Sequence, residues 1–189
     1  MRNPILKTAF FAGLAAGFAC FLYLVFLYTV GANPFGRYKY IYLGLYAIFF
    51  ATAFWYYRFK INSGHLSTGR AIGIGLLLNP IATSFYGFLL YGWMLLPQST
   101  VIERHQKALE ELQISNITFL ETQMKAAREL EDEEAFENLE EQKKDIEAAY
   151  KQMKETPLSA GVLAVDQAFG LLITGFFLAF LVALIFKTN

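Results

Sequence analysis

Few residues in this sequence have a type and spacing that could do chemistry inside a membrane. Asn79 and Thr83 lie one helical turn apart in an uncharged stretch, and Asp166 is the single acid in another. Polar side chains in apolar surroundings either line a path for a solute or proton, or form hydrogen bonds between neighbouring helices. We treat these three residues as one candidate polar intramembrane face. Helix packing is favoured for Asn79 and Thr83, and a hydrated interfacial carboxylate is favoured for Asp166.

The sequence shows no pattern of a catalytic or metal-binding site. His65 and His105 are the only histidines, and Cys20 is the only cysteine and lies within an apolar stretch. There is no phosphate-binding glycine loop, nucleophile elbow or pair of catalytic carboxylates. We therefore expect no enzyme activity, no cofactor and no bound metal.

These residues would be positioned by membrane-spanning helices. The 189 residues are 56% hydrophobic and only 17% charged, which is typical of membrane proteins. About 20 apolar residues cross the hydrocarbon core of a bilayer. Four stretches are apolar enough and long enough, or nearly so: Thr8–Val30, Tyr40–Tyr57, Ala71–Leu96 and Ala160–Phe186.

The first apolar stretch carries small residues at every fourth position, among them Ala9, Gly13 and Gly17. Such a row lets another helix backbone approach closely, which favours packing in lipid. We expect this helix to lie inside a bundle. Its neighbour is either another span of this chain, which we favour, or a second copy.

Charge divides the chain into two parts. Residues 97–157 hold 15 of the 16 acidic residues and 8 of the 16 basic ones, a net charge of −7 that the rest of the chain balances. An acidic segment of this kind argues against nucleic-acid binding. We therefore predict an all-α membrane protein with spans one to three in residues 1–96, an extramembrane insert in 97–157, and span four in 158–189.

Helical spacing runs through the insert. Apolar positions recur in steps of three and four, interrupted by Lys143, and indicate two antiparallel helices joined near Glu131 and Asp132, with a bend at Ser115–Asn116 in the first. The apolar faces of this hairpin either pack on one another or leave a face for a partner. The candidate partner-binding face comprises Ile102, Leu109, Leu112, Phe136, Leu139, Ile146 and Tyr150. We further expect Thr156 and Pro157 to begin span four.

Basic residues near the span ends predict the orientation. Six of them fall on the side of both termini, against two on the other side. Because short cytoplasmic segments are enriched in lysine and arginine, we expect both termini in the cytoplasm and the hairpin in the periplasm. The six residues are Arg2, Lys7, Arg58, Lys60, Arg70 and Lys187.

Three stretches together carry a resemblance to a known family: Asn3–Lys7 before a glycine-rich span, Gly64–Ala71 at the start of span three, and Gly175–Lys187 at the end. In this order, with a charged helical insert before the last span, the chain resembles small four-span proteins of the bacterial inner membrane whose domain has no known function. The resemblance implies the architecture and location, and it implies no activity or site residues.

Two functional hypotheses follow. The first is a non-catalytic inner-membrane protein that anchors the acidic hairpin for docking to a protein partner or a larger membrane assembly. The second is a small transporter or permeation protein with a polar path through Asn79, Thr83 and Asp166. The oligomeric state stays open.

Overall fold

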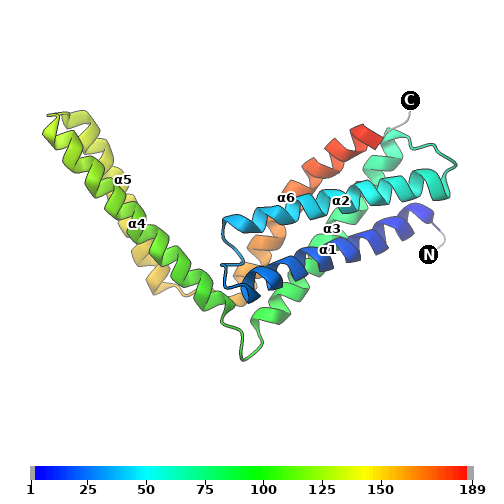
Figure 1. Cartoon of the computed structure of the whole chain (residues 1–189), viewed down its shortest axis with the longest axis horizontal. Coiled ribbons are helices and arrows are strands. Elements are labelled where there is room, and N and C mark those ends of the chain that lie inside the picture. Colours follow the sequence, from blue (N-terminus) through cyan, green and yellow to red (C-terminus); the bar gives the residue numbers. More distant parts are fainter. Residues whose placement is uncertain (1–2, 187–189) are drawn as a thin grey trace. The chain divides into compact units, whose positions relative to one another are not determined.

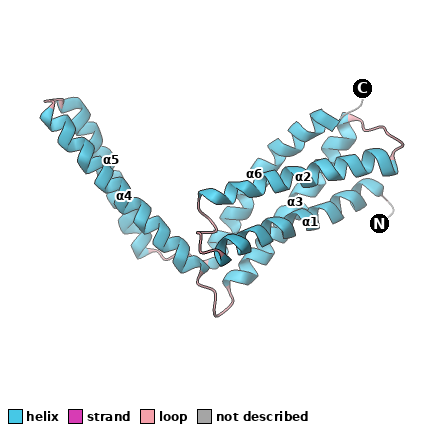
Figure 2. Cartoon of the chain, viewed as in Figure 1, coloured by secondary structure: helices cyan, strands magenta, loops and turns pink. Residues whose placement is uncertain are grey.

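All regular structure in the computed structural model, which describes residues 3–186, is helical (Figure 2). Arg2 and Lys187, which enter the charge count above, lie outside the described residues. In chain order the elements are α1 (Pro4–Thr29), the 3-10 helix η1 (Arg37–Tyr40), α2 (Ile41–Tyr56), the π-helical turn η2 (Tyr57–Ile61), α3 (Thr68–Met94), α4 (Val101–Glu129), α5 (Glu133–Glu155) and α6 (Ala160–Phe186).

Four of these segments are long and apolar enough to cross a membrane: α1, the continuous run η1–α2–η2, α3 and α6. They correspond to the four predicted spans. Large apolar side chains point outward from them, such as Phe88 at 72% and Phe177 at 68% exposure. An apolar outer surface is what a helix bundle presents to lipid. The structure therefore supports a protein that crosses the membrane several times.

The chain forms two compact units. The first, called here the four-helix unit, consists of α1, α2, α3 and α6 with their connections, and the second, called the acidic helix pair, covers residues 100–159. In the four-helix unit α3 packs on α1 and α6, and α2 packs on the same two helices, so the helices form a closed ring (Figure 1). Its interior holds the buried polar side chains of Asn79 and Thr83.

Close contact between α1 and α3 depends on small residues. A Cβ atom at Gly13 would lie 2.9 Å from the carbonyl oxygen of Leu78, and one at Gly17 would overlap the carbonyl of Ala82. The helix backbones can approach this closely only because the two positions lack side chains. The neighbour of the first span is thus another span of the same chain, as favoured from the sequence.

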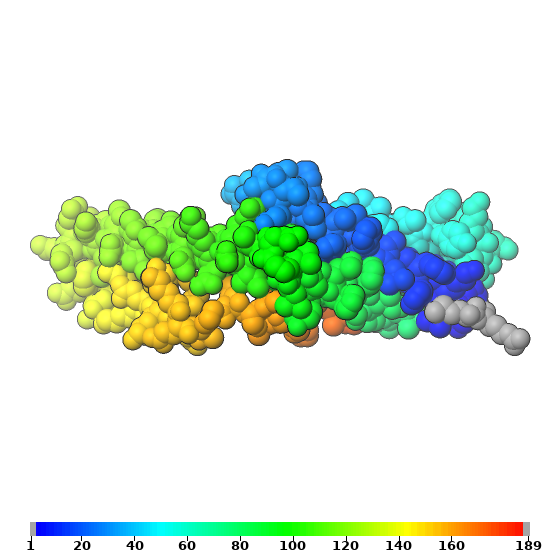
Figure 3. Space-filling model, turned by 90° about the horizontal axis from the view of Figure 1, so that it is seen from below, coloured from blue at the N-terminus to red at the C-terminus, as the bar shows by residue number. Residues whose placement is uncertain are grey.

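Helix α4 runs unbroken over 29 residues, so the bend predicted at Ser115–Asn116 is wrong. Thr118, two residues after the predicted bend, donates from Oγ1 to the carbonyl oxygen of Ile114 at 2.9 Å. A threonine that bonds back to the preceding turn is compatible with a continuous helix. Figure 3 shows α4 and α5 side by side, and the two helices contact one another along the pair.

Residues Leu130 to Asp132 connect α4 to α5. Glu131 adopts the left-handed conformation with φ of 55°, and the side chain of Asp132 caps α5 by accepting a hydrogen bond from the amide of Ala135 at 3.0 Å. Across the pair, the ammonium of Lys143 lies 2.7 Å from the Glu121 carboxylate. The lysine that interrupts the apolar stripe of α5 therefore forms an ion pair with the neighbouring helix.

The start of the last span differs from the prediction. Thr156 is the C-cap of α5 in an extended conformation, with φ of −120° and ψ of 91°, and α6 begins only at Ala160. Pro157 explains the difference, because a proline disfavours helical dihedrals in the residue before it. The pair Thr156–Pro157 therefore ends a helix and does not begin one.

Candidate functional site

Asn79 lies fully buried at the centre of the four-helix unit and connects three helices. The hydroxyl of Tyr46, on α2, donates to Oδ1 of Asn79 at 2.6 Å. The Nδ2 group of Asn79 donates to the backbone carbonyl of Leu172, on α6, at 2.8 Å. Both polar atoms of the Asn79 side chain thus have a partner within the bundle. An amide satisfied in this way stabilises helix association in lipid.

Thr83 completes this buried cluster from the next turn of α3. Its Oγ1 donates to the backbone carbonyl of Asn79 at 3.0 Å and lies 3.2 Å from that of Pro80. Pro80 lacks an amide hydrogen, so the helix ladder is one hydrogen bond short at this turn. The carbonyl that loses its donor is that of Leu76, so the bond from Thr83 does not replace the missing one; it is the ordinary bond of a helical threonine to the preceding turn.

A glycine on α6 makes room for the Asn79 side chain. A Cβ atom at Gly175 would overlap Oδ1 of Asn79 and would lie 2.7 Å from both Cγ of Asn79 and Cε1 of Tyr46. The amide of Asn79 therefore packs directly against the backbone of α6. Sequence reasoning identified Asn79 and Thr83 but not Tyr46. Tyr46 lies on α2, 33 positions before Asn79 in the sequence, and its hydroxyl reaches the Asn79 side chain only in the folded bundle.

Asp166 belongs to a different cluster. The ammonium of Lys39, on η1, donates to Oε1 of Gln167 at 3.0 Å, and Nε2 of Gln167 donates to Oδ2 of Asp166 at 2.9 Å. These groups line a crevice of about 310 Å³ that also includes Thr174 and does not include Asn79 or Thr83. The predicted polar face is therefore split, with Asn79 and Thr83 together and Asp166 elsewhere. Asp166 is exposed, while Gln167 is buried.

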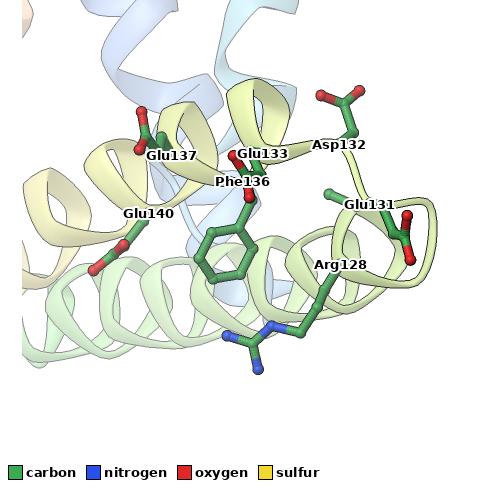
Figure 4. Close-up of a pocket in the computed structure, with 8 residues that line it drawn as sticks. Arg128, Glu131, Asp132, Glu133, Phe136, Glu137 and Glu140 are labelled. Atoms are coloured by element: carbon green, nitrogen blue, oxygen red, sulfur yellow. The ribbon is translucent and has the colours of Figure 1, made fainter.

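A hollow of about 690 Å³ lies beside the α4–α5 connection in the acidic helix pair. Figure 4 shows that its carboxylates, among them Glu131, Asp132 and Glu140, spread outward and do not converge on a common point. The Arg128 guanidinium carbon, on α4, lies 4.8 Å from the centroid of the Phe136 ring, on α5, so the two helices contact one another here. Among the residues that the structure describes, no group of three acidic, histidine or cysteine side chains could hold a metal ion.

The predicted partner-binding face divides in the structure. Ile102, Leu109, Phe136, Leu139, Ile146 and Tyr150 are half-buried, whereas Leu112 is 53% exposed. Phe119, which sequence reasoning assigned to no face, is 61% exposed. Between the helices, the hydrogen bond from Lys143 lowers the pKa of the Glu121 carboxyl below its ordinary value, and the same bond raises the pKa of Lys143.

Taken together, the four apolar helices of membrane-spanning length and the hydrogen bonds by which Asn79 joins three of them place this chain in the class of multi-pass helical membrane proteins. A protein-family model matches residues 12–188, and the chain belongs to that family, described as "Protein of unknown function (DUF4199)". The resemblance drawn from the sequence to a family of unknown function is thereby confirmed. Comparisons with curated proteins and with solved structures returned no match.

Proposed function

We propose that this protein is a non-catalytic, multi-pass protein of the bacterial inner membrane that holds the acidic helix pair outside the bilayer for docking to a protein partner. In this proposal both termini lie in the cytoplasm. Helices α4 and α5 form an antiparallel periplasmic hairpin between the third and fourth spans. The excess of basic residues on the side of the termini supports the orientation.

The observation that carries the proposal is an exposed, uncharged strip on α4. Five exposed residues follow one another in alternating steps of three and four, the spacing at which side chains share one helix face. Leu112 and Phe119 are the large apolar members, and neither is covered within the helix pair. The strip, called the α4 strip below, consists of Leu112, Ser115, Phe119, Thr122 and Ala126.

The chemistry of the strip defines the kind of partner. A narrow apolar seam on a long helix fits one further helix with a seam of its own, as in helix-in-groove and coiled-coil contacts. The segment from 97 to 157 carries a net charge of −7. We therefore expect the partner's seam to be flanked by lysine or arginine, since complementary charge speeds and orients association.

Substitution within the strip tests the docking function. Phe119→Glu places a charge on the α4 strip, while Ile114→Glu places the same charge on another exposed apolar residue of α4, which lies outside the strip. After gentle solubilisation of native membranes, we expect a stoichiometric partner to co-purify with the wild type and with Ile114→Glu, and to be lost with Phe119→Glu. The same partner retained by Phe119→Glu, or a wild type that purifies without one, would count against the proposal.

Orientation is testable separately. Glu133 is exposed at the start of α5, and the native Cys20 is buried, so a cysteine placed at Glu133 would be the reactive one. An impermeant maleimide added to intact spheroplasts should label Glu133→Cys. Labelling only after the membrane is opened would place the helix pair in the cytoplasm.

A permeation path through the polar residues has less support. Asn79 and Thr83 use their side-chain groups in contacts among α2, α3 and α6, and Asp166 lines a separate crevice. Proton or solute flux in liposomes that is abolished by both Asn79→Leu and Asp166→Asn would revive this second hypothesis.

A further inference from the structure

A groove between α1 and α2 has a volume of about 670 Å³, within the range of ligand-binding sites. It lies entirely within the four-helix unit, and both of its walls are membrane-length helices. Its lining is mainly apolar and includes Phe11, Ala12 and Phe49. One end differs, because Lys7, Thr8, Trp55 and Tyr56 are grouped there.

The length of the groove matches half of a bilayer. From Pro4 to Ala15, the two ends of its α1 wall, the helix rises roughly 16 Å, and a hydrocarbon core of about 30 Å gives each leaflet about half of that thickness. Tryptophan and tyrosine are enriched where membrane helices meet the headgroup region. Trp55 and Tyr56 are half exposed, at 46% and 48%, beside the polar end. The groove therefore runs from the headgroup level to about the middle of the membrane.

Charge at the polar end is positive and uncompensated. Lys7 is exposed and forms no ion pair with the residues that the structure describes. No acidic residue lines the groove. Asp166, the one acid outside 97–157, is held beside Gln167 and Lys39. The N-terminus of α1, which begins at Pro4 on the same wall, adds the positive end of a helix dipole.

Thr8 supplies an independent sign of a missing polar partner. Thr8 is only 7% exposed, and its hydroxyl oxygen, Oγ1, has no hydrogen-bond partner among residues 3–186. Other threonines in this chain, such as Thr118 and Thr174, bond back to the carbonyl four residues earlier. A buried hydroxyl without a partner is unfavourable. Thr8 lines the groove, but its Oγ1 atom has almost no exposed surface, so a polar group in the groove gains from this hydroxyl only when the groove wall shifts to admit it.

We propose that this groove binds one anionic phospholipid, with an acyl chain along Phe11, Ala12 and Phe49 and the phosphate group beside Lys7 and Thr8. Basic pockets between membrane helices recognise anionic headgroups in this manner. The site is separate from the acidic helix pair and does not depend on its docking function. A transmembrane helix of a second copy fits the groove less well, because no acidic residue of any span other than Asp166 could meet Lys7.

Tryptophan quenching tests the proposal directly. The chain has two tryptophans, and Trp93 lies outside the groove against Phe21 and Tyr28, so Trp93→Phe leaves Trp55 as the sole reporter beside it. The protein is reconstituted in phosphatidylcholine vesicles that contain a small fraction of brominated phosphatidylglycerol or brominated phosphatidylcholine. We expect brominated phosphatidylglycerol to quench Trp55 more strongly than brominated phosphatidylcholine. The site should bind the anionic lipid roughly fivefold more tightly than the zwitterionic one, which is the effect of one lysine near an anionic headgroup. Equal quenching by the two lipids overturns the proposal.

Two further variants separate a specific site from general attraction to the charged surface. Lys7→Gln removes the groove's own charge, and Arg70→Gln removes an equal charge from the start of α3, outside the groove. We expect the preference to vanish with Lys7→Gln and to persist with Arg70→Gln. If both variants lose the preference for the anionic lipid equally, the proposed site is refuted. Thr8→Val should weaken the preference without destabilising the protein, and a clear fall in stability would show that the hydroxyl has an internal partner instead.

Discussion

Replacement of Gly175 by alanine is the sharpest test of the buried cluster. The added methyl group would overlap Oδ1 of Asn79 and press on the Tyr46 ring, so the amide must move away from Tyr46 and from the Leu172 carbonyl. Overpacking of this kind costs about 1–3 kcal/mol. Weakening two intramembrane hydrogen bonds adds roughly 0.6 kcal/mol each, and the better helix propensity of alanine returns about 1 kcal/mol. We therefore expect Gly175→Ala to lower the free energy of unfolding by roughly 1–3 kcal/mol.

The matched control is Gly170→Ala, on the same helix. A Cβ atom at Gly170 would have no neighbour within 4 Å, so only the gain in helix propensity should remain. Both variants are compared by SDS titration of the solubilised protein, with helix content as the signal. In a protein that already carries Asn79→Ala, the loss of unfolding free energy caused by Gly175→Ala should be smaller, because the Asn79 side chain that the added methyl group would overlap is absent. A Gly175→Ala protein as stable as Gly170→Ala would refute the placement of Asn79 against α6.

Two further predictions concern the other helix contacts. Gly17→Ala should loosen α1 from α3 by pressing on the Ala82 carbonyl, while Gly44→Ala, which lies within α2 and meets nothing within 4 Å, should show only the small gain from helix propensity in the same SDS titration. The ion pair of Glu121 with Lys143 should stabilise the helix pair at neutral pH and lose that effect in acid as the pH falls through the lowered pKa of Glu121. Hydrogen-exchange protection of α5 should then fall for Glu121→Gln at pH 7 but match the wild type in strong acid; an equal difference at both pH values would contradict the assignment.

The overall plan of the membrane part could be predicted because it depends on local composition. A bilayer demands about 20 apolar residues for each helical crossing, and this requirement is visible in the sequence as four apolar stretches. The small residues at Gly13 and Gly17 likewise predicted close packing, and they meet Leu78 and Ala82 of α3. The spacing of the small residues therefore identified the packing face of α1. Because such rows are common in membrane helices, a span of the same chain was favoured as its neighbour.

Contacts between distant positions could not be predicted in the same way. Lys39 and Gln167 are 128 positions apart, and nothing in the local pattern around either residue indicates the other. The charged interruption at Lys143 showed only as a break in a stripe, because its partner Glu121 lies on the preceding helix. For Thr156, a good capping residue was outweighed by the restriction that Pro157 places on its backbone. Each of these outcomes depends on tertiary geometry or on a competing local rule.

The distribution of satisfied and unsatisfied groups indicates where function should be sought. In the centre of the four-helix unit, Asn79 has partners for both side-chain polar atoms, and such a group has little left to offer a solute. Among the residues that the structure describes, Lys7 forms no ion pair, and the hydroxyls of Thr8 in the α1–α2 groove and of Tyr86 in the bundle have no hydrogen-bond partner; Phe119 is uncovered on α4. A lipid in the α1–α2 groove and a protein on the α4 strip are the two proposals that would use Lys7 and Phe119, whereas neither of them uses the side chain of Asn79. Lys7→Gln with Phe119→Glu would separate the two roles, since the first should remove only the lipid preference and the second only the docking.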